Sequence, residues 1–329
     1  MPIPTQSDVH TNQPLTQLTE AFFQKMTDFV SMVVFPPVPV DHKSDVYYKF
    51  DRSYFFRDAM QLRAPGAEAE ASGYGLSTAT YTAQRWDLAH PIPDAIRQNA
   101  DKMINLDYAG TQFLTHQALI NREVRWAKAF FANSLWTTSI TGQATADASH
   151  VKFWDTAGST PIEDVLTGKQ TIKASTGMDA NVLVLGYKTK KALKTNPEII
   201  DRLKYGQTAP GAVVVKDTDL AQLFEVDRVV TMGAIKTTSA EGAATATYDF
   251  IGGSHALLAY AAPAPGLMVA SAGYTFNWQG LPGVTANGWR IKKYRHEPKE
   301  SDILEIQQAY AQVLAAPDLG YFFNAVLSA

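Results

Sequence analysis

Apolar side chains recur at helical spacing over residues 106–133, the longest amphipathic stretch of the chain. Arg122, Arg125 and Lys128 mostly fall off that apolar face, and no proline interrupts the stretch. A single helix of this length would measure roughly 37 Å, which suits a structural spine, although an ordinary long core helix remains the alternative. The predicted buried face comprises Leu106, Ala109, Phe113, Ile120, Val124, Ala127 and Phe131.

The segment before residue 45 is predicted to be an arm rather than a domain. Residues 1–14 are polar and contain three prolines, so they can bury little surface. Leu15–Val34 carries apolar residues at helical spacing and predicts a short helix. Residues 35–39, FPPVP, predict an extended segment that follows this helix. We therefore expect a tether that lies over another surface.

Two alternating runs, residues 45–51 and 77–88, predict a long hairpin. Both are rich in aromatic or β-branched residues, and residues 63–75 between them are small, polar or turn-forming. A two-stranded hairpin is marginal in water without a surface to lie on. The adjacent sequence offers no such surface, so we expect a neighbouring molecule to supply it.

The remaining pattern predicts an α+β chain with a compact α/β unit at about residues 177–265. The strands expected there are 181–186, 212–215, 226–230 and 255–261, and the helices are 188–193, 198–205 and 218–224. A further helix is expected at 162–175, and three strands at 274–278, 289–296 and 300–314.

Composition restricts the chemistry. Apolar residues make up 46% of the chain, charged residues 19%, and the net charge is −3, which indicates a globular protein without a strongly basic total. No cysteine is present, which excludes disulfides, thiolate zinc sites and a thiol nucleophile. The N-terminus does not read as a secretory signal and no apolar run is long enough to span a bilayer, so we expect no membrane partner.

No catalytic, cofactor-binding or metal-binding residue is predicted, and no cofactor is expected. The seven histidines form no ligand motif. Gly252–His255 lacks the spacing of a nucleophile elbow, and Gly186–Lys191 lacks that of a phosphate-binding loop. Arg290–Arg295 is a basic strand that either faces nucleic acid or, as the favoured alternative, is solvated or intersubunit.

Four sequence segments, taken in order, are similar to those of a known family: residues 181–206, residues 219–234, residues 256–280, and APDLGYFFNAV near the C-terminus. In these segments the chain resembles the major capsid proteins of tailed bacteriophages, which have the Hong Kong 97-type capsid fold. The resemblance covers about residues 15–329.

The resemblance implies a layout and a function. It implies an N-terminal arm at 1–44, an extended loop at 45–92, a peripheral domain at 93–176 and 266–329 built on the spine helix, and an axial domain at 177–265. Pentamers and hexamers of the chain would form an icosahedral head around packaged double-stranded DNA, contacted non-specifically. A portal and, in some shells, a decoration protein would be partners, in a virion assembled in the bacterial cytoplasm.

Some members of the family carry an N-terminal scaffolding segment of roughly a hundred residues, whereas only some 45 residues precede the hairpin here. The resemblance therefore implies a separate scaffolding protein, with prior removal of such a segment as the alternative. Charged residues near the hairpin tip are candidates for contacts between subunits, because repeated ion pairs can set register and reject wrong neighbours. These candidates are Arg57, Asp58, Arg63 and Glu68. The alternative functions are an encapsulin-type nanocompartment shell, which keeps the fold, and an unrelated soluble α/β enzyme.

Overall fold

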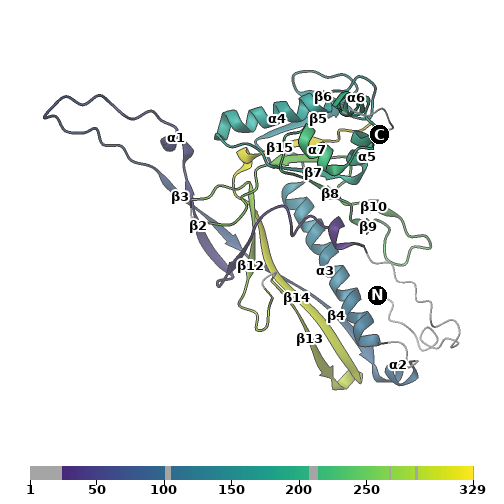
Figure 1. The fold of residues 1–329 in the computed structure, drawn as a ribbon. Coiled ribbons are helices and arrows are strands. Elements are labelled where there is room, and N and C mark those ends of the chain that lie inside the picture. Colours follow the sequence, from purple (N-terminus) through teal and green to yellow (C-terminus); the bar gives the residue numbers. More distant parts are fainter. Residues whose placement is uncertain (1–23, 101–104, 207–213, 267, 286–287, 329) are drawn as a thin grey trace.

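The computed structural model describes residues 24–100, 105–206, 214–266, 268–285 and 288–328. Figure 1 shows two sheet-containing parts, with a long hairpin projecting sideways between them. The predicted arm at residues 1–14 and the first half of the predicted helix at 15–34 lie outside the described residues.

The lower part is built around one long strand, β14 (Ser301–Leu314). It pairs antiparallel with β4 (Gln84–Pro93), β13 (Trp289–His296) and β12 (Gly273–Trp278). A short strand, β1 (Pro37–Val40), adds to β12 in parallel register. The predicted extended segment at 35–39 therefore becomes an edge strand. Proline is tolerated there because an edge strand leaves one row of backbone groups unpaired.

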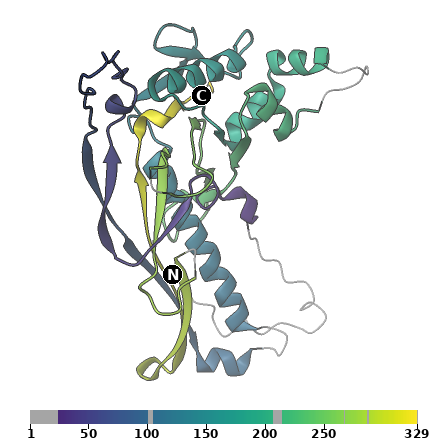
Figure 2. The same ribbon diagram turned by 60° about the vertical axis from the view of Figure 1, so that its left-hand side comes forward.

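The spine helix exists as α3 (Leu106–Phe130), capped by the Asn105 side chain, and it runs along the lower sheet (Figure 2). The predicted buried face is wrong by about one position. Phe113 is 36% exposed, while Arg122 and Glu123 are almost completely buried. The buried residues of α3 are Gly110, Leu114, Ala118, Leu119, Arg122, Glu123, Trp126 and Phe130.

The upper sheet has the order β6-β5-β15-β11-β7-β8. Its strands are β6 (His150–Lys152), β5 (Thr138–Gln143), β15 (Gly320–Asn324), β11 (Ala256–Ala259), β7 (Val182–Gly186) and β8 (Arg228–Met232). β7 and β11 are wholly buried, as continuous apolar runs predict. Strands β5, β6 and β15 come from outside residues 177–265, so this sheet brings together three parts of the sequence.

Four helices belong to the upper part: α4 (Pro161–Thr176), α5 (Tyr187–Thr195), α6 (Pro197–Gly206) and α7 (Asp217–Leu223). All four were predicted to within a few residues. A short hairpin of β9 (Ile235–Thr237) and β10 (Tyr248–Phe250) lies beside them, and two 3₁₀ turns, η2 (Glu297–Lys299) and η3 (Pro317–Leu319), precede β14 and β15.

The long hairpin consists of β2 (Ser44–Phe50) and β3 (Leu76–Thr82), in antiparallel register, with a helical turn, α1 (Arg52–Phe55), after β2. The predicted strand at 77–88 divides at Ala83, beyond which β4 enters the lower sheet and leads to α2 (Asp94–Asn99). Ala83 is fully buried and donates its N–H to Lys43, so it anchors the point where the chain changes sheets.

Two predicted elements are wrong. Residues 24–34 form a 3₁₀ turn, η1 (Met26–Asp28), and further turns instead of a helix. Residues 214–215 are not in a strand, and the rest of the predicted strand at 212–215 lies outside the described residues. For residues 24–34, tertiary contacts to α3 and to the β8–β9 turn override the local periodicity.

Candidate intersubunit surfaces

The four charged residues predicted near the hairpin tip lie in the exposed chain that follows α1. Arg57 approaches the face of the Tyr54 ring, 5.8 Å from its centroid, and Arg63 Nε donates to the Ala67 carbonyl at 2.5 Å. Asp58 and Glu68 are exposed. In the part of the chain that the structure describes, none of the four forms an ion pair, so their charges remain available to another molecule.

The hairpin also exposes many large apolar side chains, which sequence reasoning missed. Phe50, Phe55 and Tyr74 form a ring cluster with centroids 5.7–6.2 Å apart, yet Phe55 is 49% and Tyr74 63% exposed. Exposed apolar patches of this extent mark interaction surfaces. The exposed apolar residues of the hairpin are Val46, Tyr48, Tyr54, Phe55, Phe56, Met60, Leu62, Tyr74 and Leu76.

The hairpin contacts the body of its own subunit both near its root and beyond the outer end of β2. Arg52 forms an ion pair with Asp318 at 2.8 Å, and the Phe56 ring lies over Gly177 at the end of α4. Tyr81 stacks on Phe276 of the lower sheet, with ring centroids 4.4 Å apart. These contacts aim the hairpin away from the body, as Figure 1 shows.

Trypsin should therefore cut an isolated subunit after Arg63 and spare Arg85. Arg63 lies in exposed irregular chain, whereas Arg85 lies within β4, hydrogen bonded to β14, and is ion paired with Asp87. Limited proteolysis with mass spectrometry of the fragments measures both sites in one sample. Cleavage at Arg85 before Arg63 would contradict this prediction.

Three of the four cations of the basic strand Arg290–Arg295 are ion paired within the subunit. Lys292 bonds Glu305, and Arg290 bonds the side chain of Gln307. At the end of the strand, three cations and three carboxylates form a network in which Arg295 bonds Asp94, while Lys293 and Arg97 both bond Asp107 and Asp302. This arrangement favours a structural strand over a surface for nucleic-acid phosphates.

An Asp107→Asn variant should be less stable at neutral pH and equal to the native chain in acid. Arg97 and Lys293 hydrogen bond to the Asp107 carboxylate and lower its pKa to about 2, below its unfolded value, so its stabilisation is present above pH 4. The loss at pH 7 should be on the order of 1 kcal/mol, since the side chain is 36% exposed. Urea unfolding should show this difference shrinking between about pH 4 and pH 2. Asp58→Asn is the control.

Residues 24–35, which we call the strap, bind the spine helix through two of its polar side chains. The Glu123 carboxylate accepts hydrogen bonds from the backbone N–H of Val30, at 3.0 and 3.1 Å, and of Ser31, at 2.9 Å. His116 Nε2 accepts from the Gln24 N–H at 3.2 Å. Burial raises the pKa of Glu123 to about 6 and lowers the pKa of His116.

No catalytic arrangement is found in the part of the chain described. His255 Nδ1 accepts a hydrogen bond from the Ala325 N–H at 2.9 Å, and its ring packs on Phe131 and Phe322, so it is a packed core histidine. Burial lowers its pKa. Among the described residues, no group of three or more His, Asp or Glu is placed to hold a metal ion.

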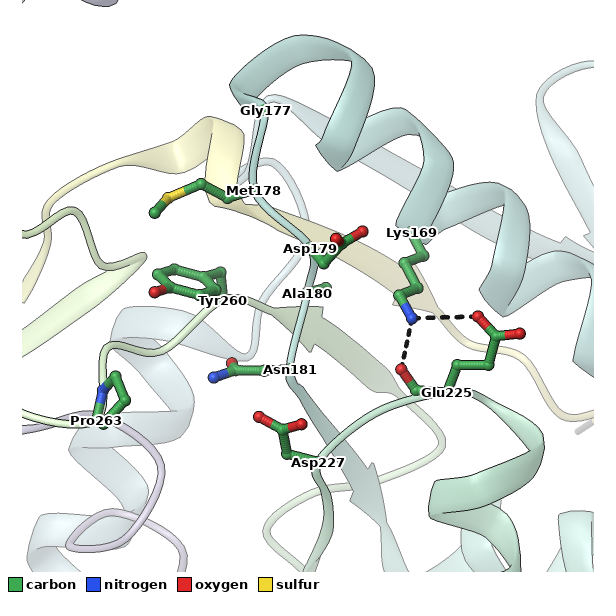
Figure 3. Close-up of a pocket in the computed structure, with 10 residues that line it drawn as sticks. All are labelled: Lys169, Gly177, Met178, Asp179, Ala180, Asn181, Glu225, Asp227, Tyr260 and Pro263. Carbon is green, nitrogen blue, oxygen red and sulfur yellow. Dashed lines mark hydrogen bonds and ion pairs between the residues drawn. The ribbon is translucent and has the colours of Figure 1, made fainter.

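A pocket of about 530 Å³ is an open surface hollow between α4, the start of β7 and the α7–β8 turn (Figure 3). Its Lys169 is bound to the carbonyl and carboxylate of Glu225, and no nucleophile is paired with a base. None of the helices described is both long and apolar enough to cross a bilayer.

Comparison with known proteins yields no matching family model, but it yields relatives that span nearly the whole chain. The major capsid protein of Burkholderia phage BcepMu is 24% identical over 306 residues, covering 91% of this chain and 92% of the relative. The major capsid protein of Pseudomonas phage JBD67 is 23% identical over 302 residues, covering 90% and 91%.

Solved structures share the fold. A phage-related protein from Bordetella bronchiseptica RB50 aligns with a TM-score of 0.67 at 21% identity, over 92% of this chain and 93% of that one. The capsid of cyanophage P-SCSP1u aligns at 0.61 and 11% identity, over 98% and 94%. An encapsulin from Synechococcus elongatus PCC 7942 also aligns, at 0.52 and 10% identity over 96% and 95%.

The fold is therefore the α+β Hong Kong 97-type fold of shell-forming capsid proteins, as the sequence predicted. Because an encapsulin shares it, the fold alone does not separate the two kinds of shell. The curated relatives are major capsid proteins of phages, which confirms the resemblance to tailed-phage major capsid proteins.

Proposed function

We propose that copies of this chain close into an icosahedral shell around the packaged double-stranded DNA of a tailed phage, as its major capsid protein. One observation carries the proposal: curated major capsid proteins match the chain over about nine-tenths of its length. The projecting hairpin with its exposed apolar side chains supports it, since it needs the surface of a neighbouring copy.

The proposed layout is the one that the resemblance to capsid proteins implies. Residues 1–44 are the arm, 45–92 the extended loop, 93–176 and 266–329 the peripheral domain, and 177–265 the axial domain of pentamers and hexamers. Arg57, Asp58, Arg63 and Glu68 near the hairpin tip pair with oppositely charged residues of an adjacent subunit. Each contact is weak alone, but many act together in a closed shell.

Further partners are proposed by analogy with capsid assembly: a separate scaffolding protein, a portal, and in some shells a decoration protein. Packaged DNA is contacted without base readout, and no cofactor or catalytic role is assigned. Assembly takes place in the cytoplasm of the bacterial host. The neutralised strand Arg290–Arg295 argues that the DNA-facing charge lies elsewhere.

An encapsulin-type shell is the second candidate, because a solved encapsulin shares the fold. Expression of the chain, with and without a scaffolding protein, followed by electron microscopy of the product tests both. Uniform round shells are expected. Shells that hold a protein cargo rather than DNA when recovered from the natural host would favour the encapsulin, and a monodisperse monomer or dimer under all conditions would contradict both.

A further inference from the structure

A groove of about 280 Å³ lies where β4, the end of α3 and β14 meet, and its chemistry suits an anion. The Arg125 guanidinium lies 4.0 Å above the Trp86 ring, and Lys128 is one helical turn further along α3. Its lining contains no carboxylate: it comprises Thr82, Gln84, Trp86, Arg125, Lys128, Ala129, Tyr310, Ala311 and Gln312.

Neither cation of the groove is neutralised inside the subunit. Several other lysines and arginines of the lower part are ion paired, as in the network around Asp107. For Arg125 and Lys128, by contrast, the described residues provide no ion-pair partner. Two adjacent cations beside an aromatic wall and several amide and hydroxyl groups form a short binding surface for a pair of negative charges.

The hairpin tip carries a matching pair of charges. Residues 67–71 read Ala-Glu-Ala-Glu-Ala and have no regular secondary structure in the subunit. When such a segment is extended, Glu68 and Glu70 point to one side, about 7 Å apart, and the alanines to the other. Side chains three apart on a helix, such as Arg125 and Lys128, have their Cβ atoms about 5–6 Å apart.

We propose that the Arg125–Lys128 groove receives Glu68 and Glu70 from the hairpin tip of a second copy of this chain. This inference rests on the proposed shell function and names the acceptor surface of the hairpin. In Figure 1 the tip projects far from β4 and the C-terminal end of α3 of its own subunit, so the contact is one between copies.

A DNA backbone is the competing anion. Binding to DNA usually relies on a stripe of cations that follows many phosphates. The lining of this groove includes only two cations, which lie within one turn of a helix, and its volume is about 280 Å³. The alternating glutamates of the tip fit that size better than a continuous polyanion.

Charge exchange tests the proposal. The Arg125→Glu/Lys128→Glu variant should reduce shell yield about tenfold or more, because it sets four carboxylates against one another. Adding Glu68→Lys/Glu70→Lys should restore shells, a rescue that damage to the fold would not permit. Failure of the combined variant to assemble, while each pair alone leaves the subunit folded, would overturn the proposal.

Cross-linking supplies a second readout, because the chain has no cysteine of its own. A Glu70→Cys/Lys128→Cys variant treated with a short bis-maleimide should give ladders of covalent oligomers from shells and not from dissociated subunits. Glu70→Cys/Lys173→Cys is the matched control, since Lys173 lies on α4, away from the groove.

The outcomes separate this contact from the function on which it rests. Normal shells without ladders would overturn the contact and leave the shell function intact, whereas the absence of shells from the unaltered chain would refute the function itself. Normal shell yield for Arg125→Glu/Lys128→Glu, together with loss of DNA retention, would overturn the proposal in favour of DNA as the occupant.

Discussion

A Glu123→Ala variant is expected to unfold with about 3 kcal/mol less free energy than the native subunit. Glu123 is fully buried, and its carboxylate is the acceptor for the N–H groups of Val30 and Ser31. Alanine leaves both buried amides without that acceptor, and each costs about 1–3 kcal/mol. Urea unfolding of the dissociated subunit, followed by tryptophan fluorescence, measures the loss.

Glu123→Gln is the matched control, because an amide oxygen still accepts one of these hydrogen bonds. Its loss should be smaller, on the order of 1 kcal/mol. An alanine variant within 0.5 kcal/mol of the native subunit, or equal losses for both variants, would show that the strap is not held by this carboxylate.

The glutamine control also predicts a pH dependence with a definite sign. Burial raises the pKa of Glu123 from 4.5 to about 6, so the native state binds this proton more tightly than the unfolded state. Its contribution is complete below about pH 4.5 and falls as the pH rises through about 6. The stability of Glu123→Gln relative to the native subunit should therefore be lowest in acid and rise by up to about 2 kcal/mol between about pH 4.5 and pH 7.

Glu123 also shows why the face of the spine helix was predicted wrongly. Apolar periodicity places the helix correctly, but it assumes that charged residues face solvent. In α3, Glu123 binds the strap, while Arg122 donates to Asn277 at 2.9 Å and lies over the Tyr310 ring. These partners lie about 90 to 190 positions away in the sequence, where no local pattern could reveal them.

The sequence predicted the positions of strands better than it predicted which strands pair. The alternation of β2 and β3 and the apolar runs of β7 and β11 predicted strands that the structure contains. These sequence patterns did not predict that β15, the last strand, would lie between β5 and β11, or that β4 would pair with β14. Register between distant strands depends on the shape of the whole core, which local propensity does not describe.

The candidate surface was predicted in part. Turn-rich composition located the hairpin tip and its charges, but the exposed aromatic side chains of α1 were not singled out as a contact surface. The basic strand Arg290–Arg295 appeared free in the sequence, because its carboxylate partners belong to α2, α3 and β14. Neutralisation by distant residues is visible only once the chain is folded.

A Gly186→Ala variant should lose about 3 kcal/mol of unfolding free energy and much of its soluble yield. Gly186 ends β7, which lies between β11 and β8 in the upper sheet, and its N–H donates to the His255 carbonyl at 3.0 Å. A Cβ atom there would meet the backbone carbonyl oxygens of Gly252 and Gly253. These backbone atoms cannot rotate away as a side chain could, so either the 252–254 turn or the β7–β11 pairing must shift.

The same crowding explains the Gly252-Gly-Ser-His255 sequence without any catalytic role. A Cβ atom on Gly252 would lie 3.0 Å from Met232 and 3.1 Å from Gly186, and Gly253 has a positive φ of 51°. Glycine is therefore required for this turn to approach β7 and place β11 in register. If this turn were catalytic, its chemistry would not tolerate a polar substitution of Ser254. We expect such a substitution to leave shell assembly unchanged.

Gly73→Ala is the control for the Gly186 prediction, since no atom lies within 4 Å of its added Cβ. Its effect on the unfolding free energy should stay within about 0.5 kcal/mol. Urea unfolding and the yield of soluble subunit compare the two variants directly. If Gly186→Ala proved as stable as Gly73→Ala, the close approach of the 252–254 turn to β7 would not be a constraint on this fold.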